Sequence, residues 1–191
     1  MFSLVHILDL KRSTTISPAQ RGQAINGDKL ELREYQQEAL SNLQAMREKK
    51  ETIALLYQAT RTGKIVTAVM DAKRVGDRTL FVAHTMELVN QAYNTFKSLW
   101  TETTVGKYAD STKDYESNVI CGSIQSVAIN LDTFNDNDFD YTIIDEAHHA
   151  TAEAYQKVLA YFKPKFILGL TATPERADDM NILDIFQKHS S

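Results

Sequence analysis

Two short segments of the chain carry side chains whose types and spacing suit the chemistry of phosphate groups. The first is Gln58-Ala59-Thr60-Arg61-Thr62-Gly63-Lys64-Ile65, which follows an apolar run and leads into a helical pattern. A loop between a strand and a helix presents backbone N–H groups to an anion, and Lys64 can reach its outer oxygens. This segment predicts a phosphate cradle, although Gly63-Lys64 by itself equally describes a turn with a surface lysine.

The second segment is Asp145-Glu146-Ala147-His148-His149, which follows the apolar run 141–144. Carboxylates are costly to place beside a core unless they meet a cation, so Asp145 predicts a hydrated Mg²⁺. Glu146 could orient or deprotonate an attacking water. The alternative is a charged loop that closes a strand. We expect His148 and His149 to point in different directions, which favours structural or coupling roles over a two-histidine metal site.

Alternating strand and helix patterns predict how these segments are positioned. The expected strands are 52–57, 79–83, 119–121, 141–144 and 166–170. The expected helices are 66–75, 87–99, 125–131 and 152–162, after a first helix whose apolar face is Tyr35, Ala39, Leu43 and Met46. Such alternation predicts an α/β fold with a mostly parallel sheet covered by helices on both faces. Ligands of these folds bind at the carboxyl ends of the strands, where both segments lie.

Length and composition limit the remaining possibilities. The chain has 191 residues, 43% of them hydrophobic, which suits one globular domain at 30–191 after a polar, partly flexible lead-in at 1–29. A single cysteine, Cys121, excludes an intrachain disulfide and a four-thiolate zinc site. No apolar run is long enough to span a membrane, so we expect a cytoplasmic protein. The net charge of −4 means that any contact with nucleic acid must be local.

The two segments resemble the Walker A and Walker B elements of superfamily 2 helicase-type ATPases of the DEAD/DEAH class. Their neighbours are similar to the motor subunits of type I and type III restriction enzymes. Four further segments agree in order with this family: the Q-motif-like 32–36, the motif Ia-like 83–88 with Gln91, the strand-contacting segment 122–126, and the motif III-like 170–176. The resemblance covers residues 32–186 and implies a three-layer α/β/α RecA-like P-loop domain.

The resemblance also implies a role for each matching residue. ATP phosphates would be bound by Gln58, Ala59, Thr60, Arg61, Thr62, Gly63, Lys64 and Ile65, and the adenine by Arg33 and Gln36. Asp145 and Glu146 would serve Mg²⁺ and the attacking water, with Lys64 and Glu146 as the catalytic pair. Nucleic-acid backbone would be contacted by His84, Thr85, Gly122, Ser123 and Gln125. The bound nucleotide would be coupled to the binding of the nucleic-acid strand by Thr171, Thr173 and His148.

The implied function is ATP-driven movement on nucleic acid, with double-stranded DNA tracked along one strand as the expected partner. Three positions depart from the family pattern. Ile65 replaces the usual Thr or Ser and cannot ligate Mg²⁺, Arg61 replaces a Gly of the phosphate loop, and Thr85 replaces an Arg. The family closes ATP between two RecA-like domains, and the second is expected to be absent here and supplied in cis or trans. We therefore expect weak or no turnover by the isolated chain.

Two other functions were weighed against this one. The departures at Ile65 and Arg61 are also compatible with a non-hydrolysing or degenerate module that binds nucleotide or DNA. A P-loop small-molecule kinase would need a lid with several arginines, and the only arginine after Arg78 is Arg176. The sequence therefore argues against the kinase.

Overall fold

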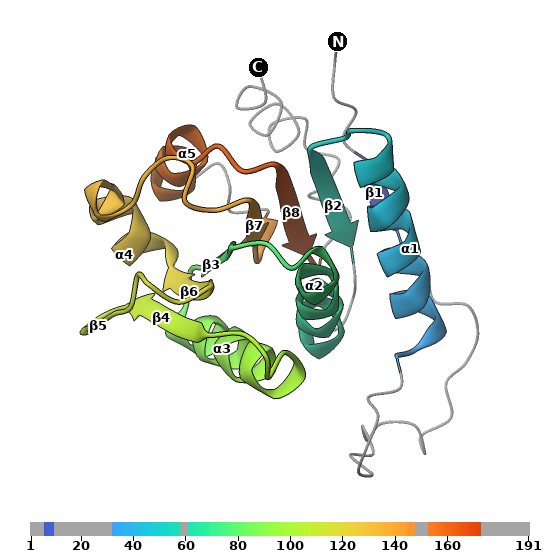
Figure 1. Ribbon diagram of the computed structural model, residues 1–191, viewed down its shortest axis with the longest axis horizontal. Helices are drawn as coiled ribbons and strands as arrows, with labels where there is room; N and C mark the ends of the chain where they lie inside the picture. Colours follow the sequence, from blue (N-terminus) through green and yellow to red (C-terminus); the bar gives the residue numbers. More distant parts are fainter. Residues whose placement is uncertain (1–5, 10–31, 58–60, 148–152, 173–191) are drawn as a thin grey trace.

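The computed structural model describes residues 6–9, 32–57, 61–147 and 153–172, with the side chains of 6–9, Arg61 and Thr62 left out of the description. Its centre is an eight-stranded sheet in the order β1-β2-β8-β7-β3-β6-β4-β5, in which every neighbouring pair is parallel except β4 and β5 (Figure 1). The strands are β1 (His6–Asp9), β2 (Ile53–Tyr57), β3 (Thr79–Ala83), β4 (Val105–Ala109), β5 (Thr112–Lys113), β6 (Val119–Ser123), β7 (Tyr141–Ile144) and β8 (Phe166–Thr171).

Helices cover both faces of this sheet. The helices are α1 (Glu34–Glu48), α2 (Arg61–Val75), α3 (Met86–Leu99), α4 (Ile124–Ile129) and α5 (Glu153–Tyr161), with a short 3₁₀ turn at Leu131–Thr133. One core cluster joins α1, α2 and α3 to one face, and a second joins α4 and α5 to the other. The predicted three-layer α/β/α architecture is therefore confirmed.

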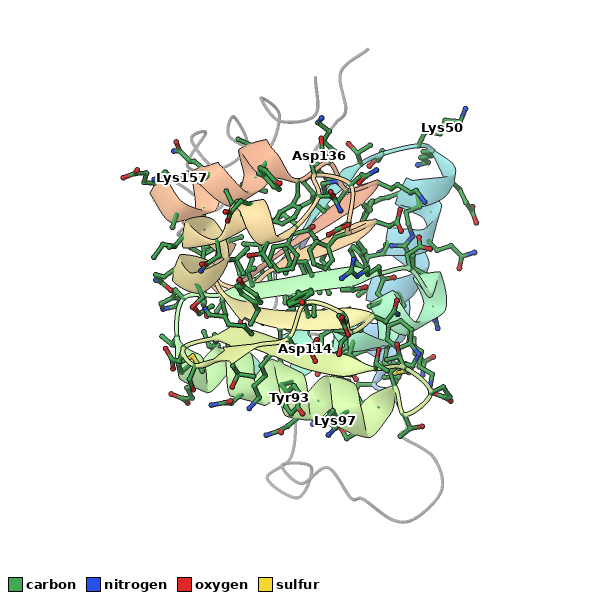
Figure 2. All side chains as sticks on the ribbon, turned by 60° about the vertical axis from the view of Figure 1, so that its left-hand side comes forward. Lys50, Tyr93, Lys97, Asp114, Asp136 and Lys157 are labelled. Carbon is green, nitrogen blue, oxygen red and sulfur yellow. The ribbon has the colours of Figure 1, made fainter. Side chains whose placement is uncertain are left out.

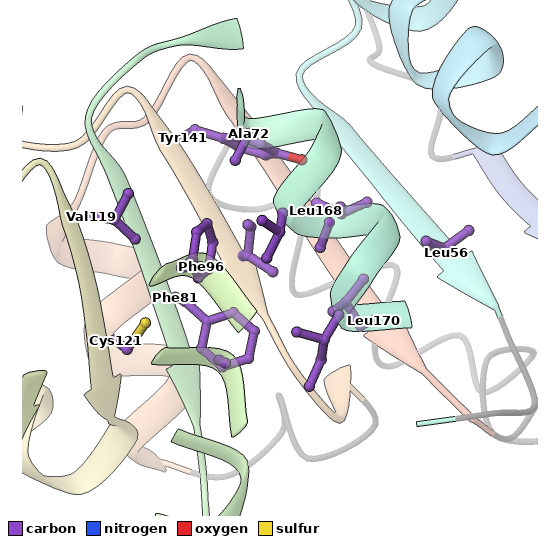
Figure 3. Packing of buried hydrophobic residues seen from close by; sticks show 14 of the residues in the cluster. Leu56, Ala72, Phe81, Phe96, Val119, Cys121, Tyr141, Leu168 and Leu170 are labelled. Atoms are coloured by element: carbon purple, nitrogen blue, oxygen red, sulfur yellow. The ribbon is translucent and has the colours of Figure 1, made fainter. Parts of the chain in front are cut away.

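The central strand β3 shows why the predicted strands were continuous apolar runs. Leu80 and Val82 belong to the core beneath α4 and α5, whereas Phe81 and Ala83 belong to the core beneath the other three helices. Successive residues of a strand point to opposite faces, so a strand covered on both sides must be apolar throughout. Figure 3 shows Phe81 beside Phe96 of α3, with their ring centroids 6.4 Å apart in an edge-to-face arrangement.

Charged side chains lie mainly on the outside of the helices and in the connecting loops. Figure 2 shows Lys97 on the outer side of α3 and Lys157 on the outer side of α5, on opposite sides of the sheet. Lys157 forms an ion pair of 2.7 Å with Glu153 one turn earlier in α5. None of the described helices is long and apolar enough to cross a bilayer.

The five predicted strands are all present, and β3 and β7 have the predicted bounds. Helix α3 was predicted to within one residue of its start, whereas α2 begins at Arg61, five residues earlier than predicted. Residues 61–65, which were predicted to belong to the phosphate loop, thus form the start of α2. Helix α4 ends two residues early, at Ile129, and the chain continues into the 3₁₀ turn.

Three strands were not predicted. Strand β1 lies within residues 1–29, which were assigned to a lead-in, and it pairs in parallel with β2 at the edge of the sheet. It begins with His6 and ends with Asp9, so only two of its four residues are apolar. Strand β4 contains Gly106 and Lys107, which are both depleted in strands, and β5 consists of two exposed residues. On α1 the predicted apolar face is buried except for Tyr35, which is only half-buried, while Gln36 and Leu40 are buried instead.

Phe81→Ala is expected to destabilise the chain by about 3–5 kcal/mol, because it opens a cavity between β3 and α3 that the sheet cannot close. Urea unfolding followed by far-UV circular dichroism measures this difference. Tyr115→Ala, at an exposed aromatic side chain, is the matched control and should change the free energy of unfolding by no more than about 0.5 kcal/mol. A cost for Phe81→Ala near that of the control would contradict the described core.

Candidate functional site

The predicted site residues gather at one edge of the sheet. Strands β2, β8, β7, β3 and β6 are consecutive neighbours and all run in the same direction. Their carboxyl ends are therefore side by side. Thr171 is the last residue of β8, Asp145 follows β7, His84 follows β3 and Ser123 ends β6. The expectation that these segments meet at one edge is borne out by the order of the strands.

The Lys64 ammonium is the centre of this edge. Its Nζ lies 3.7 Å from Oδ1 of Asp145 and 3.6 Å from Oε1 of Glu146, and the side chain is only 1% exposed. These are ion-pair distances, and among the described residues Nζ has no hydrogen-bond partner. A buried ammonium with unused N–H donors is costly. An anion with several oxygens, such as a phosphate group, would satisfy them.

The charges at this edge favour a cation as well as an anion. Asp145 and Glu146 carry two formal negative charges against the single positive charge of Lys64. Among the described residues no three His, Cys, Asp or Glu side chains form a metal-binding group. A metal ion here would therefore take its ligands from the Asp145–Glu146 pair, from water and from a bound phosphate, which is the usual situation for Mg²⁺.

The backbone after β7 holds both carboxylates in place. The Asp145 N–H donates to the Val82 carbonyl of β3 at 2.9 Å, and the Glu146 N–H donates to Oδ1 of Asp145 at 2.9 Å. Glu146 has a φ of 53°, in the left-handed region that side chains with a Cβ rarely adopt. Such strain persists only where the surroundings enforce it, and it is concentrated at functional sites.

The environment of Asp145 disfavours its ionised form. Burial raises the pKa of Asp145 above its ordinary value, Lys64 opposes this shift, and the charge of Glu146 adds to it. The Tyr155 hydroxyl of α5 donates a hydrogen bond of 3.5 Å to the Asp145 carbonyl. Burial also raises the pKa of Tyr155, and the charges of Asp145 and Glu146 raise it further, so this hydroxyl stays protonated. Sequence reasoning missed Tyr155 because it looks like any apolar position of an amphipathic helix.

Gln36 connects the start of α1 to the phosphate segment. Its side chain is buried, and its Nε2 donates to the Gly63 carbonyl at 3.4 Å while its Oε1 accepts from the Arg33 N–H at 3.0 Å. Arg33 itself is exposed and donates to the Tyr35 hydroxyl at 3.2 Å. The Gly63 carbonyl also accepts a bond of 3.0 Å from the Thr67 hydroxyl. This amide link between α1 and α2 was not predicted from the sequence.

Ile65 is a core residue in this structure. It is 1% exposed and lies in the same cluster as Leu56 of β2 and Leu170 of β8. Its side chain is therefore turned to the apolar core, and it supplies no oxygen to the site.

Two of the predicted nucleic-acid residues act as helix caps. The Thr85 hydroxyl accepts from the Leu88 N–H at 3.3 Å at the start of α3, and the Ser123 hydroxyl accepts from the Ser126 N–H at 3.2 Å at the start of α4. Ser and Thr are preferred at this position because their oxygen satisfies an otherwise unpaired amide. The cap of α3 is thus a structural role for Thr85, at the position where the family usually has Arg. His84 is partly buried and Gln125 is exposed.

Gly122 is required by the packing of α4. A Cβ at this position would lie 2.6 Å from Cγ2 of Val127 and 3.4 Å from the Tyr108 carbonyl. The glycine therefore lets α4 approach β6 closely.

Several predicted residues fall outside what the structure describes. Gln58, Ala59, Thr60, His148 and Thr173 lie in the undescribed segments, as do the side chains of Arg61 and Thr62. Thr171 is described, and it is buried opposite Tyr57 in the β2–β8 pairing.

The fold and this edge together define a class of protein. A three-layer sheet domain in which a buried lysine of the helix after one strand meets paired carboxylates after another strand of the same parallel sheet is the RecA-like domain of superfamily 2 helicases. Residues 29–176 match the family described as type III restriction enzyme, res subunit, and the chain belongs to this family. The resemblance found in the sequence is confirmed.

Similar proteins agree with this assignment. The chain is 33% identical over 161 residues to the DNA 3'-5' translocase XPB2 of Sulfurisphaera tokodaii. The alignment covers 79% of this chain and 33% of XPB2. It is 33% identical over 121 residues to IRC3 of Saccharomyces cerevisiae, a protein named for ATP-dependent helicase activity, over 58% of this chain and 17% of IRC3. The crystal structure of the Hef helicase domain of Pyrococcus furiosus aligns with a TM-score of 0.63 at 26% identity, over 81% of this chain and 36% of that one. The chain thus spans about a third of the length of XPB2 and 17% of the length of IRC3.

Asp145→Asn is expected to gain stability relative to the wild type as the pH rises from acidic to neutral. Because the pKa of Asp145 is raised by folding, its ionisation costs stability as pH rises above about 4, the value of the unfolded chain. The variant removes this cost, so its advantage over the wild type should grow between pH 4 and pH 7. Urea unfolding at both pH values measures it, with Asp132→Asn as an exposed control. An advantage that is independent of pH would contradict the shift.

Gly122→Ala is expected to destabilise the chain by about 1–3 kcal/mol, because the added methyl group overlaps Val127. Val127→Ala in the same chain should relieve the overlap, so that the double variant loses less stability than the sum of the two single variants. Chemical denaturation of the four chains measures this coupling. Strict additivity would show that Gly122 is not held by this contact.

Proposed function

We propose that this chain is the ATP-binding domain of a helicase or DNA-translocase ATPase, in which ATP hydrolysis drives movement on nucleic acid. The observation that carries the proposal is the buried Lys64 ammonium, which faces Asp145 and Glu146 and lacks a hydrogen-bond partner among the described residues. A lysine in this state is suited to a phosphate. The family match and the similarity to XPB2 and Hef support the proposal.

Each residue of the edge has a separate task in this proposal. Lys64 binds the outer phosphate oxygens, which replace part of its present contact with the carboxylates. Asp145 holds Mg²⁺, and the bound ion would neutralise charge on the phosphates. Glu146, next to Asp145 and held in a strained backbone conformation, orients the attacking water or takes its proton. Tyr155 supports the backbone beneath both carboxylates.

The two Q-motif positions have different tasks in this proposal. Arg33 is exposed at the start of α1 and can reach an adenine ring or its edge. Gln36 is buried and already engaged with Gly63 and Arg33, so we assign it to holding the phosphate segment in place. A bound base would contact Gln36 only through an exchange of these hydrogen bonds.

The proposed partner is nucleic acid, with double-stranded DNA tracked along one strand. Thr85 and Ser123 cap two helices at the same edge, and helix starts bind phosphates through their free amides. The name of XPB2 as a DNA translocase favours DNA. A second RecA-like domain, in cis or trans, would complete the ATP site and supply the charge that stabilises phosphoryl transfer.

A non-hydrolysing nucleotide-binding module is the second candidate. It is favoured by one observation, the burial of Ile65 in the core where the family usually presents a hydroxyl. Without that ligand, nucleotide binding would depend less on Mg²⁺ and turnover would be slow.

The test compares ATP binding and hydrolysis in the wild type, Lys64→Ala, Glu146→Gln and Ile65→Thr. Calorimetry with ATP and Mg²⁺ should show binding by the wild type and at least about 10-fold weaker binding by Lys64→Ala, which loses a charged phosphate contact. Glu146→Gln should keep the affinity and lose about 10²–10⁴-fold in hydrolysis, measured with double-stranded DNA on the chain fused to a second RecA-like domain. Lys157→Ala, at an exposed lysine of α5, is the control for charge.

The two candidates give different results in this experiment. Hydrolysis that DNA stimulates and that Ile65→Thr increases supports the motor. Binding without hydrolysis in both the wild type and Ile65→Thr, even with the second domain present, would favour the non-hydrolysing module. No binding of ATP by the wild type would exclude both.

A further inference from the structure

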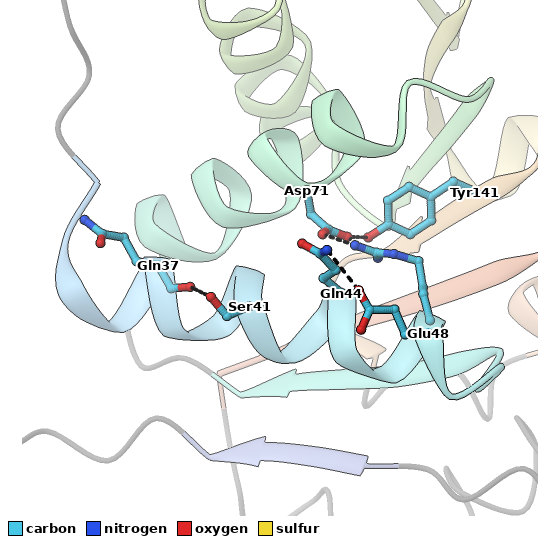
Figure 4. A network of polar contacts seen from close by, with 7 residues as sticks. Gln37, Ser41, Gln44, Glu48, Asp71 and Tyr141 are labelled. Atoms are coloured by element: carbon cyan, nitrogen blue, oxygen red, sulfur yellow. Dashed lines mark hydrogen bonds and ion pairs between the residues drawn. The ribbon is translucent and has the colours of Figure 1, made fainter.

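A buried polar network lies at the far end of α2 from Lys64. The Asp71 carboxylate accepts two hydrogen bonds from the Arg47 guanidinium, at 2.8 Å and 2.6 Å, and a third from the Tyr141 hydroxyl at 2.7 Å. Figure 4 shows Asp71 directed at the Tyr141 hydroxyl above the C-terminal part of α1. Asp71 and Tyr141 are fully buried, and Arg47 is partly exposed.

The charges of this network are balanced within it. Arg47 and Asp71 form a bidentate ion pair, and the guanidinium lies 5.1 Å from the ring centroid of Phe166, the first residue of β8. Burial, together with the neighbouring Asp71 charge, raises the pKa of Tyr141 far above its ordinary value, so the hydroxyl remains a donor. The Tyr141 hydroxyl is therefore a lasting hydrogen-bond donor to Asp71 near neutral pH.

The network joins the four elements that carry the candidate site. Arg47 belongs to α1, Asp71 to α2 and Tyr141 to β7, and Phe166 begins β8. At the other end of the same elements lie Gln36 of α1, Lys64 of α2, Asp145 after β7 and Thr171 of β8. Helix α1 is thus tied to α2 near both ends, by Gln36 to Gly63 and by Arg47 to Asp71.

Helix α2 is connected to β7 at both ends in the same way. Lys64 meets Asp145 at one end, and Asp71 meets Tyr141 at the other. The seven residue steps from Lys64 to Asp71 span about 10.5 Å of helix, and the four steps from Tyr141 to Asp145 span about 13 Å of strand. The two spans are close enough for α2 to lie antiparallel along β7 with both connections made.

Between the two connections α2 faces the sheet with apolar side chains. Ala68 lies four residues after Lys64 and three before Asp71, on the same side of the helix. It is fully buried, with Ile65 and Val69, in the core cluster that contains Ile143. This packing holds α2 against the sheet but is non-directional. The directional hydrogen bonds at Asp71 add a constraint on the axial position of α2.

We infer that Asp71 and Tyr141 are positioning residues for Lys64. By fixing α2 along β7, they set the distance between the Lys64 ammonium and the carboxylates of Asp145 and Glu146. Arg47 completes the arrangement, because it balances the Asp71 charge and ties α1 to the same point. The inference rests on the proposed nucleotide-binding function, in which that distance determines how Lys64 meets a phosphate.

The first test is a double-mutant cycle on the full chain with ATP and Mg²⁺. Tyr141→Phe removes one hydroxyl and keeps the apolar packing, and it should weaken ATP binding about 3- to 10-fold. In the Lys64→Ala background the same change should have less than about a 1.5-fold effect, because Tyr141 acts through Lys64. Tyr108→Phe is the matched control. It removes a hydroxyl whose hydrogen bond to the Thr133 hydroxyl, 3.2 Å long, lies away from the site. It should leave ATP affinity unchanged.

A second test needs no nucleotide. If Tyr141 holds Lys64 near Asp145, the contribution of Lys64 to stability should depend on the Tyr141 hydroxyl. In urea unfolding at one pH, the combination of Tyr141→Phe with Lys64→Ala should therefore lose less stability than the sum of the two single variants. Tyr108→Phe and Lys64→Ala should be additive.

The outcomes separate the inference from the proposed function. Equal effects of Tyr141→Phe on ATP affinity with and without Lys64, or additive effects of Tyr141→Phe and Lys64→Ala on the free energy of unfolding, would overturn the inference and leave the proposed function intact. Absence of ATP binding by the wild type would contradict the proposed function. The unfolding cycle would then decide the inference alone.

Discussion

The structure depends on one buried interaction, the contact of the Lys64 ammonium with the carboxylates of Asp145 and Glu146. Three charges removed from water are costly unless they compensate one another, and here two negative charges face one positive charge. Such an arrangement is tolerated only if the surrounding elements hold it. Helix α2 and strand β7 do so by packing against each other and by the hydrogen bonds of Asp71 at their opposite ends.

The sheet explains why these charges meet. Parallel strands place their carboxyl ends at one edge, and the order of β2, β8, β7, β3 and β6 brings together segments as far apart in the chain as Tyr57 and Thr171. The same topology makes the strands largely apolar on both faces, so the charged residues of the site come just after the strands. Not every residue next to the site faces it. Ile65 directly follows Lys64, and its side chain is part of the hydrophobic core.

Small polar residues at the proposed nucleic-acid edge have two compatible roles. Thr85 and Ser123 satisfy amides at the starts of α3 and α4, which stabilises these helices. Helix starts also carry partial positive charge and free N–H groups, which attract phosphates without basic side chains. A chain with a net charge of −4 can thus contact a nucleic-acid backbone through its local geometry.

The sequence by itself determined most of the elements and the candidate site residues, because apolar periodicity and the residues that follow each strand are local properties. It predicted β3 and β7 to the residue, and it placed Lys64 and Asp145 at strand ends. Only the tertiary structure decided that Ile65 is core, that Gln36 bonds Gly63, and that Asp71 bonds Tyr141 across 70 residues of chain. These contacts join residues with no local pattern in common. Their partners are decided by how α1, α2 and β7 pack, and a pattern within one segment carries no information about that packing.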